Sequence, residues 1–120
     1  MKKILVTGGA GFIGSAIIPE LQEHGHEIYV IDDLSFGNRD FINIPDDHFY
    51  QLDILERKKL EEVVAKIKPD WVIHLAAVHF IPYCNQHPFE SSNINIMGTS
   101  NVLNAVKRTK STQVIFFAST

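Results

Sequence analysis

The chain has 120 residues, of which 45% are hydrophobic and 21% are charged, and it contains a single cysteine. These values predict one soluble globular domain that can bury a core without a disulfide or a structural metal. One cysteine cannot form an internal disulfide, which favours a reducing compartment. The net charge of -3, with 14 carboxylates against 11 lysines and arginines and no basic stripe, argues against a nucleic-acid partner.

Apolar runs along the chain are too short for a membrane span, which needs about 20 residues. The apolar start at residues 4–6 stops at Thr7-Gly8-Gly9, before the roughly 7–15-residue apolar core of a signal peptide could form. We therefore expect a cytoplasmic protein without a membrane partner.

Short apolar runs alternate with segments of helical periodicity along the whole chain. The first helix is expected over residues 12–24, with Ile13, Ile17 and Leu21 on its buried face, a bend at Pro19 and a C-terminal cap at Gly25. Residues 34–47 read as a loop. The remaining predictions are a helix that includes residues 60–67, a long helix from about 89 to 109, and strands at 4–6, 28–31, 49–52, 71–75 and 114–117.

Strands that are apolar throughout, with helices between them, predict an α/β fold with a parallel sheet that is covered on both faces. Right-handed crossovers then favour a doubly wound sheet with the strand order 3-2-1-4-5.

A glycine-rich turn joins the first strand to the first helix. It can be read as Gly9-x-Gly11-x-x-Gly14 or as Gly8-x-x-Gly11-x-x-Gly14, and both fit a phosphate-binding turn. Glycines permit a tight turn and the close approach of a pyrophosphate to the N–H groups at the helix start. Such turns also occur without ligands, but the flanking strand and helix favour dinucleotide binding here.

An acidic residue, Asp32, ends the second strand eighteen residues beyond Gly14. A carboxylate at this place accepts hydrogen bonds from the adenosine ribose and repels a 2′-phosphate, and the nearest cation in sequence is Arg39. NAD is therefore expected rather than NADP. Further residues expected to border the adenosine pocket are Asp33, Leu34, Ser35 and Gly37, of which Asp33 is the best candidate for a simple turn residue.

Five ordered motifs resemble the N-terminal part of the extended short-chain dehydrogenase/reductases, and specifically the NAD-dependent nucleotide-sugar epimerases and dehydratases with their Rossmann fold. The resemblance covers essentially the whole chain. The motifs are Thr7-Gly8-Gly9-Ala10-Gly11-Phe12-Ile13-Gly14, Asp32-Asp33-Leu34, Asp53-Ile54, His74-Leu75-Ala76-Ala77 and Asn95-Ile96-Met97-Gly98-Thr99.

The resemblance implies roles for individual residues. Asp53 and Ile54 would flank the adenine ring, Asn95 would order the backbone near the active site, and His79 would reach the cofactor ribose or phosphate. The small side chains after the fourth strand would let the cofactor pass. The complete expected cofactor set is Gly8, Gly11, Phe12, Ile13, Gly14, Asp32, Asp33, Leu34, Ser35, Gly37, Asp53, Ile54, Leu75, Ala76, Ala77, His79 and Asn95.

The resemblance also implies a role for Thr120, the last residue. Its hydroxyl group would form a hydrogen bond with the substrate hydroxyl that is oxidised. The Tyr-x-x-x-Lys motif that supplies the family's general acid/base is missing, because no tyrosine of this chain is followed four residues later by lysine. We therefore expect residues 1–120 to form the NAD-binding portion of a longer epimerase or dehydratase, without activity of their own and without the substrate region that would bind a nucleotide sugar.

Two other functions remain open at this point. One is a noncatalytic dinucleotide-binding module, against which Thr120 speaks; the other is an NAD(P)-dependent reductase of the same fold, which would release its cofactor in each cycle. The long helix could pack on the sheet only or also form a homodimer. No metal site is expected, because the spacing of His74, His79, Cys84 and His87 matches no compact zinc pattern.

Overall fold

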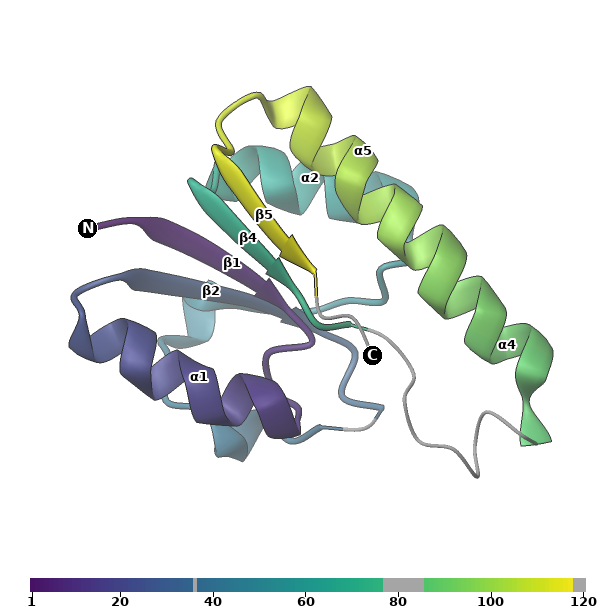
Figure 1. Cartoon of the computed structure of the whole chain (residues 1–120), viewed down its shortest axis with the longest axis horizontal. Coiled ribbons are helices and arrows are strands. Elements are labelled where there is room, and N and C mark those ends of the chain that lie inside the picture. Colours follow the sequence, from purple (N-terminus) through teal and green to yellow (C-terminus); the bar gives the residue numbers. More distant parts are fainter. Residues whose placement is uncertain (36, 77–85, 118–120) are drawn as a thin grey trace.

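A five-stranded parallel sheet forms the centre of the molecule in the computed structural model, which describes residues 1–35, 37–76 and 86–117 (Figure 1). The strand order is β3-β2-β1-β4-β5, and each neighbouring pair is parallel. Both the α/β class and the predicted strand order are thus confirmed. The strands are β1 (Lys3–Thr7), β2 (Glu27–Asp32), β3 (Phe49–Gln51), β4 (Trp71–His74) and β5 (Val114–Phe117).

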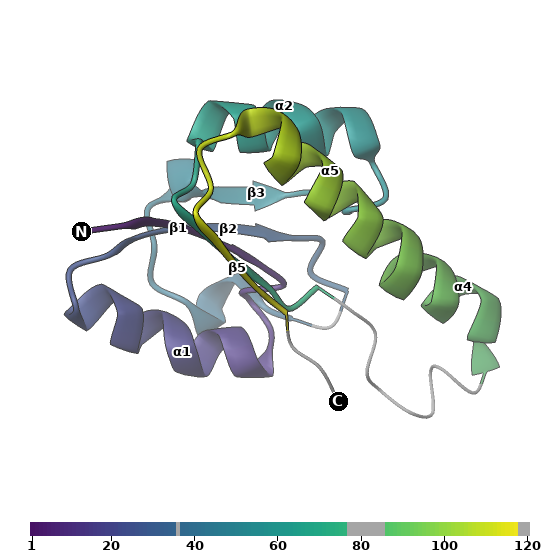
Figure 2. The ribbon, with the colours of Figure 1, turned by 45° about the horizontal axis from the view of Figure 1, so that its top comes forward.

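Helices lie on both sides of this sheet, with α1 on one side and α2 and α5 on the other (Figures 1 and 2). Within the three described segments, no helix is long and apolar enough to cross a lipid bilayer. The α-helices are α1 (Phe12–Glu23), α2 (Arg57–Ile67), α4 (Pro88–Ser92) and α5 (Thr99–Thr109), and 3-10 helices occur at Arg39–Phe41 and Asp46–His48.

The side chains of β1 belong to two separate hydrophobic clusters, because successive side chains of a strand point to opposite faces of the sheet. Leu5 packs with the residues of α2 and α5, whereas Ile4 and Val6 pack with those of α1, and all three side chains are fully buried. The apolar run at residues 4–6 of this central strand is therefore buried on both faces, as the sequence predicts.

The buried side of α1 differs from the prediction by one residue position. The structure buries Gly14 and Ile18, with Leu21 packed beside them, whereas Ile13 is 51% exposed. Apolar side chains at four-residue spacing allow either of two adjacent stripes of the helix to be buried, one starting at Ile13 and one starting at Gly14. The close packing of Gly14 on the turn selects the stripe that contains Gly14 and Ile18. Gly25 follows the helix at a φ of +83°, as expected for a C-terminal glycine cap.

The predicted long helix is divided into three parts. A π-helical segment at Asn93–Gly98, called the π segment below, separates α4 from α5. Met97, an apolar residue of the π segment, is 50% exposed, and the helix extends past the carboxyl ends of the strands toward α4 (Figure 1). A π segment inserts one extra residue into a turn, so a regular helical period cannot predict the burial of residues before it.

Strand β5, at the edge of the sheet, is only partly covered by the described residues on the side of α1. On the side of α1, Val114 is 38% exposed and Phe116 is 51% exposed, and the Trp71 ring meets the Phe116 ring edge-on at 6.4 Å. The fifth strand therefore exposes apolar side chains on this face. We expect such a surface to favour association between copies or to lower stability.

Candidate functional site

The candidate site lies at the carboxyl edge of the sheet, where the predicted motifs meet. Residues 8–14 follow β1, Asp32 ends β2 and residues 33–35 and 37 come after it, Asp53 and Ile54 follow β3, and Leu75 and Ala76 follow β4. The segments are joined by backbone hydrogen bonds from Gly8 N to Ile31 O at 2.7 Å and from Asn38 N to Ala10 O at 3.0 Å. Parallel strands bring their loops to one edge, which is where open α/β sheets bind ligands.

The glycines of the turn fall into two groups. A Cβ on Gly8, whose φ is +70°, would lie 2.7 Å from Ala76 N, and one on Gly14 would lie 2.3 Å from Gly9 O. These two glycines are required by the protein itself. A Cβ on Gly11 would meet only Gly8 O, at an ordinary 3.4 Å, and its backbone is extended. Among the described residues, Gly8 O is the only atom within 4 Å of that Cβ, so their packing does not explain the glycine at position 11.

Helix α1 begins at this turn, and no described side chain caps its first N–H groups. Its N-cap residue is Gly11, no side chain caps it, and its first turn contains no acidic residue. The first N–H groups of a helix have no partner within the helix and carry a partial positive charge. Phe12, at the start of the helix, is 89% exposed. This arrangement can hold an anionic group such as a phosphate against the turn.

Asp32 links the turn to the end of β2. Its Oδ2 accepts a hydrogen bond from Ala10 N at 3.0 Å and its Oδ1 accepts one from Leu34 N at 2.7 Å, with 8% of the residue exposed. Burial raises the pKa of Asp32, and the two backbone hydrogen bonds oppose that rise. Each carboxylate oxygen retains a second acceptor site, which is suited to a hydroxyl donor such as a ribose.

Arg39, the cation nearest to Asp32 in the sequence, is bound to other groups. The Arg39 guanidinium donates to Ile42 O at 3.2 Å and to Ile44 O at 2.8 Å, and it pairs with Asp46 at 3.1 Å. It also lies 5.0 Å from the centre of the Phe49 ring. These interactions bind Arg39 within its own loop, so it is poorly placed to neutralise a 2′-phosphate at Asp32.

The other residues of the predicted adenosine pocket lie on the same loop. Leu34 has a positive φ of 65°, and Ser35 N donates to Asp33 Oδ1 at 3.0 Å, so Asp33 caps a turn as one reading of the sequence suggested. A Cβ on Gly37 would lie 2.5 Å from Ala10 O, so this glycine lets the loop pack on the turn.

The Asp53–Ile54 segment is held from the side of the long helix. Asp53 Oδ1 accepts from Leu55 N at 2.9 Å, and Asn101 donates to Ile54 O at 2.9 Å. Gly98 lies so close that a Cβ there would be 2.4 Å from Ile54 Cδ1. The sequence analysis assigned no role to Gly98 or Asn101, because their partner lies more than forty residues earlier in the chain.

The end of β4 is held against the turn by a second buried group that the sequence analysis missed. Thr7 Oγ1 accepts hydrogen bonds from Leu75 N at 3.1 Å and Ala76 N at 3.3 Å. Asn95 lies in the π segment, and its carbonyl oxygen accepts a hydrogen bond from the Thr99 hydroxyl. Three predicted residues, Ala77, His79 and Thr120, lie outside the described part of the chain.

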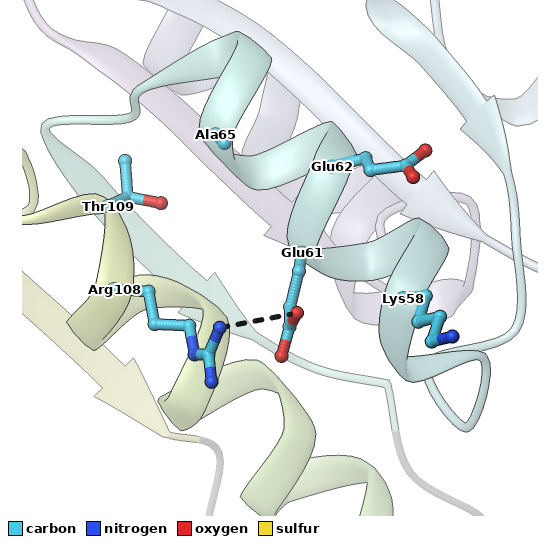
Figure 3. A pocket seen from close by; sticks show the side chains of 6 residues that line it. All are labelled: Lys58, Glu61, Glu62, Ala65, Arg108 and Thr109. Carbon is cyan, nitrogen blue, oxygen red and sulfur yellow. Dashed lines mark ion pairs between the residues drawn. The ribbon is translucent and has the colours of Figure 1, made fainter.

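A separate polar groove lies between α2 and α5 (Figure 3). Glu61 is its central group: its Oε2 lies 3.8 Å from Arg108 Nη1, and its Oε1 accepts from Asn104 at 2.9 Å and from Arg57 at 3.2 Å. The carboxylate is thus already used to join the two helices. The groove contains none of the predicted cofactor residues, and among the described residues no group of three or more histidine, cysteine or acidic side chains could hold a metal ion.

A parallel sheet with a glycine turn at its carboxyl edge is the arrangement typical of dinucleotide-binding α/β proteins. A sequence profile of the NAD dependent epimerase/dehydratase family matches residues 4–120, and the chain belongs to this family. The dTDP-glucose 4,6-dehydratase of Neisseria meningitidis is 39% identical over 113 residues, which are 89% of this chain and 32% of that protein.

Solved structures agree with this membership. The UDP-glucose 4-epimerase of Thermotoga maritima, solved with UDP-glucose, matches with a TM-score of 0.90 and 32% identity over 98% of this chain and 38% of that one. The UDP-glucose 4-epimerase of Thermus thermophilus, solved with NAD, matches with a TM-score of 0.86 and 31% identity over 95% of this chain and 36% of that one. The chain therefore spans about a third of the length of these relatives.

Proposed function

We propose that this chain binds NAD along the carboxyl edge of its sheet and forms the cofactor-binding part of a nucleotide-sugar epimerase or dehydratase. The observation that carries the proposal is Gly11, the one glycine of the turn that the packing of the described residues does not require. A bound pyrophosphate, lying against the N–H groups at the start of α1, supplies the missing reason for a glycine there.

The expected roles of the other residues fit the same ligand. Asp32 accepts the ribose hydroxyls, and its negative charge, with Arg39 engaged elsewhere, favours NAD over NADP. Asp53 and Ile54 flank the adenine ring, and Leu75 and Ala76 line the path toward the nicotinamide. The names and bound NAD of the relatives support this assignment.

In the whole enzyme, bound NAD would accept a hydride from a sugar carbon and later return it. The residues of this chain would hold the cofactor and, at Thr120, orient the sugar hydroxyl. A general acid/base would have to come from outside residues 1–120, because the chain has no Tyr-x-x-x-Lys motif. We therefore propose that the chain binds NAD but has no epimerase or dehydratase activity alone.

Calorimetric titration of the chain with NAD and NADP tests the proposal, with Gly11→Ala as the decisive variant. The added methyl group fits the fold but occupies the space of the pyrophosphate, so we expect NAD affinity to fall at least about tenfold while the far-UV circular dichroism stays unchanged. Glu20→Ala is the control, since it changes an exposed residue in the second half of α1, away from the turn. Full affinity in Gly11→Ala would refute the assignment.

The ribose assignment has its own pair of variants. Asp32→Asn removes the charge but keeps the shape, so we expect weaker NAD binding and a smaller preference for NAD over NADP. Asp40→Asn is the control, because Asp40 is an exposed carboxylate of the same loop region. If the wild-type chain bound both cofactors equally, Asp32 would not have the role proposed for it.

A further inference from the structure

A buried series of hydrogen bonds joins the glycine turn to the π segment. Thr7 Oγ1 lies 2.6 Å from His74 Nδ1, and His74 Nε2 lies 3.0 Å from Thr99 Oγ1. Thr99 Oγ1 in turn lies 2.7 Å from Asn95 O. Thr7 is 0% exposed and His74 is 5% exposed, so water does not compete strongly for these groups.

The donors and acceptors of this series can be assigned in only one direction. Thr7 Oγ1 already accepts from two backbone N–H groups, so its own proton goes to His74 Nδ1. Thr99 donates its proton to Asn95 O, the only acceptor of that pair, so it must accept from His74 Nε2. His74 is therefore a neutral imidazole with its proton on Nε2. Burial, which lowers the pKa of His74 to about 4, agrees with the neutral form.

The far end of the series lies where the long helix changes its winding. In a regular α-helix, the carbonyl of Asn95 would accept from the N–H of residue 99; here the Thr99 hydroxyl donates to that carbonyl, within the turn where the π segment meets α5. A π segment turns all preceding residues about the helix axis relative to a regular helix. The Thr99 hydroxyl is thus placed to help fix how Asn95 and α4 face the cofactor edge.

We propose that His74 and Thr99 are positioning residues that keep the π segment in register with the glycine turn. His74 serves as the connector because an imidazole can accept from Thr7 at one nitrogen and donate to Thr99 at the other. Both ends of this series of hydrogen bonds border the proposed cofactor path, so we expect a change in it to alter the affinity for NAD. That part of the inference rests on the proposed function. It gives a binding role to two residues that do not themselves line that path.

The test compares Thr99→Val, which keeps the shape and loses the hydroxyl, with Thr99→Ser, which keeps the hydroxyl. Nitrogen-15 spectra of the His74 ring should show an unprotonated Nδ1 and a protonated Nε2 in the wild-type chain. We expect Thr99→Val to perturb this pattern, to speed amide exchange over residues 93–98, and to weaken NAD binding roughly five- to tenfold. Thr99→Ser should resemble the wild type in all three measurements.

Two results would overturn the inference: wild-type NAD affinity and amide exchange in Thr99→Val, or an equal loss in Thr99→Ser, which would make the methyl group the important part. A wild-type chain that does not bind NAD would refute the proposed function instead. In that case the ring spectra and the exchange over residues 93–98 still decide whether His74 and Thr99 position the π segment.

Discussion

The two faces of the sheet are built from equally apolar strands but are covered to different extents. On one face, α2 and α5 cover the strands and bury Leu60, Val64 and Val102 completely. On the other face, α1 packs over β1 and β2, while Val114 and Phe116 of β5 remain partly exposed (Figures 1 and 2). Strand composition therefore tells which residues can be buried, and the neighbouring helices decide which are.

The face covered by α2 and α5 is called the closed face below, and the face of α1, which leaves part of β5 exposed, the open face. The closed face has the larger cluster of buried side chains, and it should contribute more to stability because apolar burial stabilises in proportion to the area removed from water. The candidate cofactor site lies at the carboxyl edge, between the two faces, and takes residues from loops above both. Changes on the closed face should therefore alter unfolding strongly, whereas changes at Phe116 should alter it little.

The largest expected effect is that of Leu60→Ala on the closed face. Leu60 is 0% exposed, and its truncation should lower the free energy of unfolding by about 3 kcal/mol, through lost burial and the cavity left behind. Urea denaturation monitored by circular dichroism measures this value. Phe116→Ala is the matched truncation on the open face and should cost less than about 1 kcal/mol. Equal losses in the two variants would remove the distinction between the faces.

The second effect is a loss of stability on acidification that comes from His74, at the edge of the closed face. Its pKa is lowered by burial from 6.5 to about 4, so between these values the unfolded chain binds a proton that the folded chain does not. Stability is therefore full above pH 6.5 and falls toward pH 4, with about 2 kcal/mol lost at pH 5. The raised pKa of Asp32 acts in the opposite direction.

Two measurements isolate the His74 contribution from that of the carboxylates. The ring resonances of His74 should titrate near pH 4 in the folded chain, and His74→Asn should reduce the slope of stability against pH between 4 and 6.5. A ring that titrates near pH 6.5 would show that His74 is not held neutral by its surroundings.

A third, smaller effect concerns the contact between Gly98 and Ile54 on the closed face. Gly98→Ala improves helix propensity but places a Cβ 2.4 Å from Ile54 Cδ1, so we expect a net loss of about 1 kcal/mol. Ile54→Val removes that terminal methyl group. Because Ile54 Cγ1 would also lie 2.8 Å from the added Cβ and is kept by valine, the Ile54→Val background should relieve the loss only in part, whereas in the Ile54→Ala background Gly98→Ala should become neutral or stabilising; a double-mutant cycle by thermal unfolding measures the coupling. Simple additivity would mean that the backbone moves instead.

The strand order was predictable because each strand is a short apolar run and the crossovers between parallel strands have one hand. The buried side of α1 was not, because Ile13 and Ile18 start two stripes with the same period, and only the packing of Gly14 separates them. The π segment was equally hidden: its register is linked to a hydroxyl–histidine contact between residues 25 positions apart.

The candidate site shows the same division. Gly11 and Asp32 could be predicted because a glycine turn and a strand-end carboxylate occur at a fixed spacing. The partners that hold the site in place, such as Thr7 with Leu75 and Asn101 with Ile54, are contacts between distant parts of the chain. No local pattern marks them, although a polar residue at the buried end of an apolar strand, as at Thr7 and His74, is a usable signal.

The smallest expected effect on stability comes from replacing the exposed aromatic side chain of the open face. Phe116→Thr removes apolar surface that is already 51% exposed and keeps a β-branched residue in the strand, so the free energy of unfolding should change by less than about 0.5 kcal/mol. Self-association should become weaker instead, because exposed apolar side chains on an edge strand favour contact between copies.

Sedimentation velocity at increasing concentration measures this effect, and Phe116→Thr should associate less than the wild type. Phe41→Thr, which changes an aromatic residue that is 57% exposed in a 3-10 helix, should not reduce it. A wild-type chain that stays monomeric at high concentration would mean that the open face is too small or too well hydrated to act as a contact surface.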